Sequence, residues 1–205
     1  MSTQTENSQS LLEDSAQPMR KIGDRYALLA LIGTGESAEV YRAKDVLLGV
    51  DRALKLLSQP HRSAWRRRFR LEARTMARLS HPSILRVYDF GVDAETGTDY
   101  FVMDFAPGGS LDARLQRDGP LPLGQAARYV LQVLSALEQA HEAGIIHRDV
   151  KPQNILIGQN DRAMLGDFGI AWIEESIMAR AGSTVGTMVF MAVSYTHLTL
   201  PTTYT

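Results

Sequence analysis

The sequence predicts an α+β fold of two lobes, the first rich in strands and the second rich in helices. Three observations lead to this prediction. Short segments with the alternation typical of strands fill the first half of the chain, the pair Gly108-Gly109 interrupts them, and a long segment of helical periodicity follows. Because a cleft between two lobes is a common binding place, we expect a ligand there.

The first lobe is expected to contain five strands and one helix. The strands are predicted where β-branched, aromatic and alternating residues gather, at residues 26–32, 39–43, 52–57, 84–90 and 100–105. Residues 62–79 are predicted to be a helix, which His81-Pro82 ends. Residues at steps of three and four share one face of this helix: Phe69, Glu72, Ala73, Met76 and Leu79.

The second lobe is expected to be built around a helix at residues 126–142, which Gly144 ends. One stripe of residues is predicted to form its inner face: Val130, Val133, Leu134, Leu137 and His141. Short strands are predicted at residues 155–157 and 163–165. The division into domains is therefore a polar, disordered tail, a first lobe and a second lobe, at residues 1–20, 21–106 and 107–192.

Composition excludes several classes of protein. The chain has 205 residues, 44% hydrophobic and 22% charged, which suits a globular protein with a core. It has no cysteine, so disulfide scaffolds, thiolate nucleophiles and Cys-ligated zinc are excluded, and a reducing cytoplasm is the expected location. The net charge is −1, and no apolar run approaches the ~20 residues that cross a bilayer.

The most informative segment runs from His147 to Asn154 and is followed by Asp167-Phe168-Gly169. Asp149 can take a proton from a hydroxyl group, and Lys151 can neutralise a phosphate. Asn154 and Asp167 offer the oxygen ligands that Mg²⁺ prefers. His147 follows two isoleucines and is expected to orient this loop. The segment therefore predicts a site for phosphoryl transfer.

Two further features support this site. Lys55 lies in an apolar strand and Glu72 lies on the apolar face of the helix at 62–79, so an ion pair would satisfy both, although each alone could be a surface charge. The segment Gly33-Thr34-Gly35 lies between two strands, where glycines let backbone N–H groups approach phosphates. Taken alone, this segment could equally be an ordinary hairpin.

Together these motifs resemble the bacterial Hanks-type, or eukaryotic-like, serine/threonine protein kinases. The Gly loop, strand Lys, helix Glu, His-Arg-Asp loop with its Asn, and Asp-Phe-Gly occur in order between residues 25 and 192. The resemblance implies a protein-kinase-like fold with a complete β-rich N-lobe and a truncated α-rich C-lobe. It also implies transfer of the ATP γ-phosphate to Ser or Thr of protein substrates, with ATP and Mg²⁺ as cofactors.

The resemblance assigns roles to matching residues. The base, the phosphate contacts and the ion pair would be Asp149, Lys151, Lys55 and Glu72. The Mg²⁺ ligands would be Asn154 and Asp167. Contacts to ATP would come from Ile32, Gly33, Gly35, Val40, Ala53, Lys55, Met103, Asp104, Ala106 and Ser110. Ala38 replaces the family's third glycine, which is expected to stiffen the loop.

The segment after Asp167 is expected to be the activation loop. Ser183 and Thr184 are candidate sites of autophosphorylation, which would bring two copies of the chain together, and Arg148 would pair with the phosphate. A plain polar loop is the alternative for these two residues. The arginine run 65–70 could suggest nucleic acid, but its arginines interleave with inner positions of the helix, so we expect a solvated face and no nucleic-acid partner.

The resemblance stops at Ala192, where Val193-Ser194 stand in place of the family's Pro-Glu. Residues 193–205 are Thr-rich without a helical stripe, and we expect them to be a non-native tail. The chain is then expected to be poorly soluble and inactive by itself, whereas the natural protein is active and its membrane attachment is undetermined. The alternatives are a pseudokinase or ATP-binding scaffold, and a small-molecule phosphotransferase of the same fold.

Overall fold

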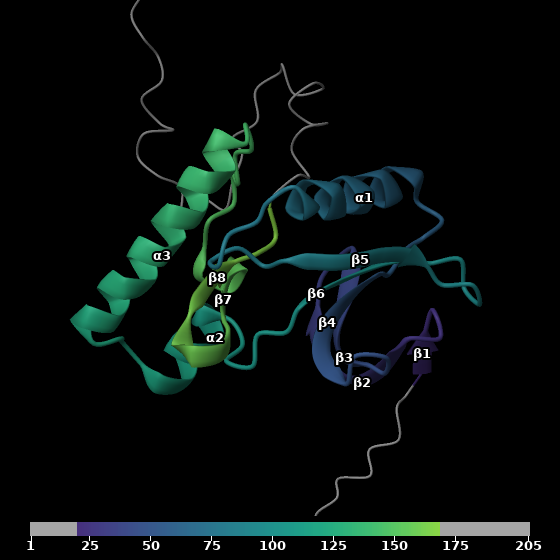
Figure 1. The fold of residues 1–205 in the computed structure, drawn as a ribbon, viewed down its shortest axis with the longest axis horizontal. Coiled ribbons are helices and arrows are strands. Elements are labelled where there is room, and N and C mark those ends of the chain that lie inside the picture. Colours follow the sequence, from purple (N-terminus) through teal and green to yellow (C-terminus); the bar gives the residue numbers. More distant parts are fainter. Residues whose placement is uncertain (1–19, 169–205) are drawn as a thin grey trace, which may run out of the picture.

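The computed structural model describes residues 20–168, which form two lobes (Figure 1). The strand-rich lobe contains β1 to β6 and α1, and the other lobe contains α2, α3, β7 and β8. The predicted α+β fold of two lobes is therefore confirmed.

The first lobe is a six-stranded antiparallel sheet with the order β1-β2-β3-β4-β6-β5. Its strands are β1 (Arg20–Ile22), β2 (Tyr26–Thr34), β3 (Ala38–Asp45), β4 (Val50–Leu57), β5 (Val87–Val92) and β6 (Asp99–Asp104). The three residues of β1 are too few for a periodicity to show, and the first of them falls inside the expected tail. The predicted strand at 84–90 begins later, because Ile84 instead bridges to Leu165 in the other lobe.

Helix α1 (Ser63–Ala77) packs on the sheet as its apolar spacing predicts. Phe69, Ala73 and Met76 are buried, and the rings of Phe69 and Phe101 lie 5.0 Å apart. Glu72 shares this face and points at the sheet. The helix therefore places the Glu72 carboxylate beside its buried residues, on the side that faces the other lobe.

The second lobe contains α2 (Leu111–Asp118), α3 (Leu123–Glu142), and the hairpin of β7 (Ile155–Ile157) and β8 (Ala163–Leu165). The two strands have the predicted bounds. The sequence prediction did not include α2, although Ser110 is a good N-cap residue and accepts a hydrogen bond from the Ala113 N–H. Single-turn 3-10 helices occur at Pro152–Asn154 and Gln159–Asp161.

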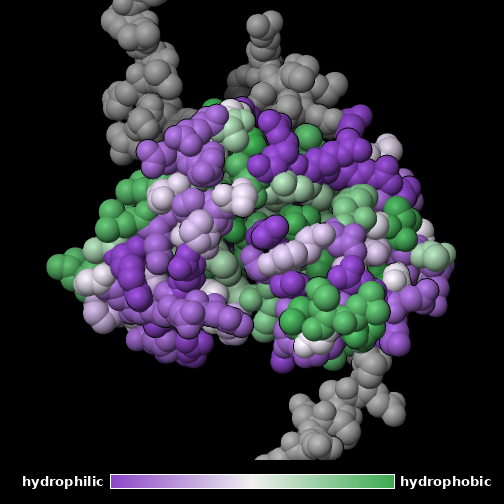
Figure 2. All heavy atoms as spheres, viewed as in Figure 1, coloured by the Kyte–Doolittle hydropathy of each residue, from purple (hydrophilic) through white to green (hydrophobic). Residues whose placement is uncertain are grey.

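The predicted inner face of α3 was partly wrong: Val133 is buried and Leu137 packs against the core, but the other three residues do not face inward. The buried residues are Tyr129, Val133, Ala136 and Ala140. Val130 and Leu134 are 57% and 54% exposed, His141 is exposed, and apolar atoms lie along this helix in Figure 2. Small alanines face β8 because the helix approaches the hairpin closely. Among the residues that the structure describes, no helix is both long and apolar enough to cross a membrane.

One hydrophobic core continues from the first lobe into the second. It includes Met76 of α1, Phe101 of β6, Ala136 of α3 and Phe168. Backbone hydrogen bonds also join the lobes, from Leu85 N–H to the Leu165 carbonyl and from Leu165 N–H to the Ser83 carbonyl. This shared core holds the two faces of the cleft in a fixed relation.

The glycine pair between the lobes is required by close packing and by backbone conformation. A Cβ on Gly108 would lie 2.8 Å from the Cβ, Cγ2 and carbonyl oxygen of Ile157, and Gly109 has a φ of 68°. We expect Gly108→Ala to lower the free energy of unfolding by about 1–3 kcal/mol, measured by urea denaturation. A Cβ on Gly124, in α3, would meet open space. Gly124→Ala is the control and should raise stability by about 0.5–1 kcal/mol.

Candidate active site

Lys55 is the centre of a charged cluster between the lobes. Its ammonium lies 2.6 Å from Glu72 Oε1 and 2.8 Å from Asp167 Oδ1. Strand β4 places Lys55 opposite Phe101 of β6, and α1 brings Glu72 to it from above the sheet. The side chains of Lys55 and Glu72 are only 12% and 17% exposed. The predicted ion pair is therefore confirmed, and Asp167 joins it as a third member.

The pKa values in this cluster follow from having two carboxylates for one ammonium. Burial raises the pKa of Glu72 to about 7, against the opposing effect of Lys55. The Lys55 ammonium lowers the pKa of Asp167, whose side chain is 56% exposed. Burial disfavours the charge on Lys55, but Asp167 and Glu72 outweigh this effect and raise its pKa. Glu72 is thus the member that takes a proton first, while Lys55 stays charged.

The loop around Asp149 forms the other half of the site. Lys151 Nζ lies 2.7 Å from Asp149 Oδ2. The Asn154 side-chain amide donates to both the Asp149 carbonyl, at 2.8 Å, and Asp149 Oδ2, at 3.0 Å. The Gly166 N–H donates to the Asn154 carbonyl, which brings this loop beside the segment that carries Asp167. The four residues predicted from two separate motifs therefore belong to one site.

His147 connects these segments. Its Nε2 lies 2.8 Å from the Gly166 carbonyl and therefore carries the hydrogen, while Nδ1 accepts from the Asp149 N–H at 3.3 Å. The ring is 1% exposed and lies 4.6 Å from the Phe168 ring. This arrangement requires neutral imidazole, and burial lowers the pKa of His147 accordingly. The predicted orienting role of His147 is confirmed.

Acid is expected to weaken the fold through His147. An unfolded histidine has a pKa of about 6.5, and the folded pKa is lower, so the unfolded chain binds the proton better. The stabilising contribution is complete above about pH 6.5 and is lost as the pH falls below it. His147→Gln should flatten the decline in unfolding free energy between about pH 7.5 and 5.5, measured by denaturant titration. The exposed His141→Gln control should leave the slope unchanged.

Two residues in these loops have left-handed backbone conformations that disfavour side chains. Arg148 has a φ of 66° and Asp167 a φ of 47°. Such conformations cost of order 1–3 kcal/mol and persist where surrounding contacts enforce them. Here the contacts are the hydrogen bonds on either side of Gly166 and the ion pair with Lys55. The strain therefore coincides with the two segments that carry the charged groups.

Several of the residues predicted to surround ATP lie on neighbouring strands of the sheet. In the sheet register, Val40 pairs with Lys55, and Ala53 with Met103. The Gly35 N–H donates to the Ala38 carbonyl at 2.8 Å, which closes the glycine loop. Ile32 is 49% exposed and Met103 is buried. Their contacts to a nucleotide stay a prediction.

Other predicted residues have structural partners. The Asp104 side chain accepts from the Arg86 N–H and the Tyr88 hydroxyl, and the Asp104 N–H donates to the Arg86 carbonyl at 3.0 Å. Its contact to a nucleotide stays a prediction. Ala106 is partly buried, and its carbonyl accepts from the Gly109 N–H. The Ser110 oxygen caps α2, which leaves its hydroxyl hydrogen for a ligand. Ser183 and Thr184 lie outside the described residues.

The arginine run was only partly a solvated face. Arg66 and Arg70 both bind Asp99, a carboxylate that is 0% exposed at the start of β6. A second cluster forms around Asp161, which accepts from Arg114, Arg128, Tyr129 and Gln125. Neither cluster was predicted, because the partners are about 30 or more residues apart in sequence and no local pattern marks them.

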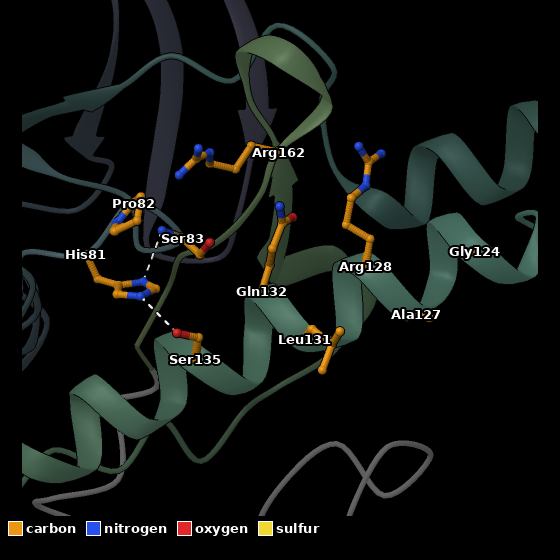
Figure 3. A pocket seen from close by; sticks show the side chains of 10 residues that line it. All are labelled: His81, Pro82, Ser83, Gly124, Ala127, Arg128, Leu131, Gln132, Ser135 and Arg162. Atoms are coloured by element: carbon orange, nitrogen blue, oxygen red, sulfur yellow. Dashed lines mark hydrogen bonds between the residues drawn. The ribbon is translucent and has the colours of Figure 1, made fainter.

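A pocket of about 520 Å³ lies away from the charged cluster, between α3, residues 81–83 and the β7–β8 turn (Figure 3). His81 closes one side, because its ring lies 3.1 Å from Ser135 Oγ and accepts from the Ser83 N–H. Its lining residues are His81, Pro82, Ser83, Gly124, Ala127, Arg128, Leu131, Gln132, Ser135 and Arg162. The pocket contains none of the predicted site residues.

The fold and the site have the features of the protein kinase class: a sheet lysine pairs with a helix glutamate, and a loop with Asp, Lys and Asn lies in the other lobe. Residues 26–197 match the family model of the protein kinase domain. The chain belongs to the protein kinase family.

Several curated relatives are bacterial serine/threonine kinases. The DNA damage-responsive serine/threonine-protein kinase RqkA of Deinococcus radiodurans is 39% identical over 179 residues, which cover 85% of this chain and 27% of RqkA. PknE of Mycobacterium tuberculosis is 42% identical over 82% of this chain and 30% of PknE. Probable PknB of Corynebacterium glutamicum is 39% identical, over 83% and 28%. The chain spans less than a third of these relatives. The family uses ATP and a divalent metal ion in general.

Proposed function

We propose that this chain is the ATP-binding and catalytic part of a serine/threonine protein kinase that acts in the cytoplasm. The observation that supports it most is a pair of contact sets. Glu72 contacts Lys55, which contacts Asp167 across the lobes, and in the second lobe Asn154 and Lys151 both contact Asp149. RqkA, PknE and probable PknB are named as serine/threonine kinases, which supports protein Ser and Thr hydroxyls as the phosphate acceptors.

The proposed roles follow from position and charge. The Asp149 carboxylate lies beside the Lys151 ammonium and accepts the proton of the substrate hydroxyl. Lys55 holds the α- and β-phosphates, and Glu72 fixes the direction of its side chain. Lys151 offsets charge on the transferred phosphate. The protein thus contributes position and charge, which phosphoryl transfer requires most.

Asn154 and Asp167 fit a magnesium ion by the chemistry of their donor atoms. The side-chain nitrogen of Asn154 donates to Asp149, so the side-chain oxygen Oδ1 is left for a cation. Asp167 adds a half-exposed carboxylate. When bound, Mg²⁺ neutralises charge on the phosphates. Residues 20–168 contain no group of three acidic, His or Cys side chains that could hold a metal, so phosphate oxygens and water would complete the ligand set.

The test is phosphate transfer by the full-length protein from γ-labelled ATP with Mg²⁺ to a generic basic protein, followed by phosphoamino-acid analysis. Label on Ser or Thr supports the proposal. Nucleotide binding without transfer would indicate a scaffold, and transfer only to small molecules would indicate the other kinase-like class. Mass spectrometry of the same sample tests autophosphorylation at Ser183 and Thr184, and with it the proposed self-association.

A further inference from the structure

The charged contact between α1 and β6 is built around a fully buried carboxylate. Asp99 is 0% exposed and accepts from Arg70 Nε at 3.1 Å and Nη2 at 2.7 Å, and Arg66 Nε binds its other oxygen. Arg66 Nη2 also donates to the Gly97 carbonyl at 3.2 Å. Two arginines one helical turn apart thus hold a single carboxylate at the end of the β5–β6 hairpin.

Helix α1 needs such a contact because its own sequence stabilises it poorly. It has no side-chain N-cap and no acidic residue in its first turn. It carries five arginines, and its only carboxylate is Glu72. Arginines near a helix N-terminus oppose the helix dipole, and like charges four residues apart repel. Asp99 supplies the negative charge that the first half of the helix lacks.

The position of this contact fixes the rotation of α1. At 3.6 residues per turn, Phe69, Ala73 and Met76 form the buried stripe, Arg66 and Arg70 lie on one side of it, and Glu72 lies on the other. The helix is therefore held along both edges of its buried stripe. If the edge at Asp99 is released, the helix can roll or fray, and Glu72 then moves away from Lys55.

We propose that Asp99, Arg66 and Arg70 are positioning residues that hold Glu72 against Lys55 in the kinase reaction. The inference rests on the proposed function. The strand register supports it, because Asp99 lies two residues before Phe101, which pairs with Lys55 and packs on Phe69. The contact therefore anchors α1 to the same part of the sheet that carries the lysine.

Asp99→Asn in the full-length protein tests this inference, because it keeps the size of the side chain and removes its charge. We expect kcat/KM to fall about tenfold or more, and hydrogen exchange in residues 63–77 to become faster. In a Glu72→Gln background, Asp99→Asn should cause no further loss of kcat/KM, because the contact acts through Glu72. Arg70→Gln, at a side chain 40% exposed, is a milder second variant with the same expected direction.

Asp93→Asn is the matched control. Asp93 is a 2% exposed carboxylate in the same hairpin, bound by Arg20 of β1 and by Thr96, and none of its side-chain hydrogen bonds or ion pairs within residues 20–168 is with α1. This change should lower the melting temperature and leave kcat/KM within about twofold. Unchanged kcat/KM in both Asp99→Asn and Arg70→Gln, or losses that multiply with Glu72→Gln, would overturn the inference. An inactive wild type would instead refute the proposed function, while hydrogen exchange would still test the anchoring of α1.

Discussion

Replacing Asp149 with Asn is expected to lower kcat by about 10²–10⁴-fold, the usual contribution of a positioned base. The carboxylate is held by Lys151 at 2.7 Å and by the Asn154 amide at 3.0 Å. The variant keeps its backbone carbonyl as an acceptor for Asn154, so the loop is retained while the base is lost. The KM for ATP should change little, because Asp149 faces the substrate hydroxyl. Steady-state phosphate transfer with varied ATP separates the two constants.

Asp118→Asn is the control for this change. Asp118 is the last residue of α2, is 46% exposed, and its carboxylate accepts from the Arg117 guanidinium at the surface. Its replacement removes the same charge in the same lobe away from the loop at 147–154, so kcat should stay within about twofold. A kcat of Asp149→Asn equal to that of the wild type would exclude Asp149 as the base.

Lys55→Met is expected to have the second-largest effect, a loss of about 10²–10³-fold in kcat/KM. The change removes the ammonium that holds Asp167 and would bind phosphates. Glu72 and Asp167 are then left without their shared cation, so burial should keep Glu72 protonated. The rise in melting temperature on adding Mg-ATP should shrink in the variant, because ligand stabilisation follows affinity.

Lys44→Met separates this effect from a general loss of positive charge. Lys44 lies on β3 in the same sheet, is 43% exposed, and pairs with Asp51. Both kcat/KM and the Mg-ATP shift should match those of the wild type, since exposed pairs of this kind contribute little. A normal nucleotide shift in Lys55→Met would show that the lysine does not contact the nucleotide.

Local patterns predicted the elements that depend on neighbouring residues. Strand alternation located the middle strands of the sheet and both β7 and β8, and the steps of three and four located α1. The bounds differ by a few residues, because hydrogen bonding to a partner strand decides where a strand ends. The short α2 was missed even though Ser110 carried an N-cap signal, since eight residues make only about two turns, too few for a helical periodicity to stand out.

Patterns failed where a distant partner decides the outcome. The stripe on α3 was predicted from large apolar residues, but the helix turns Ala136 and Ala140 toward the hairpin. Where the helix lies close to the hairpin, larger side chains would not fit. Choosing the inner face by the size of its apolar residues therefore placed it incorrectly at Val130 and Leu134. The pattern of α1 alone predicted that Arg66 and Arg70 face solvent. Their partner, Asp99, is about 30 residues further along the chain and leaves no mark on that pattern.

The sequence by itself predicted the chemistry that we propose for this protein. Asp149, Lys151, Asn154 and Asp167 stand at short spacings on two loops, and only a few reactions use such groups together. The tertiary structure alone decided that Lys55 is shared by Glu72 and Asp167, that His147 is a neutral link, and that Asp99 anchors α1. The physical reason is range: spacing along the chain reports neighbours within a helix or loop, whereas charge pairing and burial depend on segments that meet only when the chain folds.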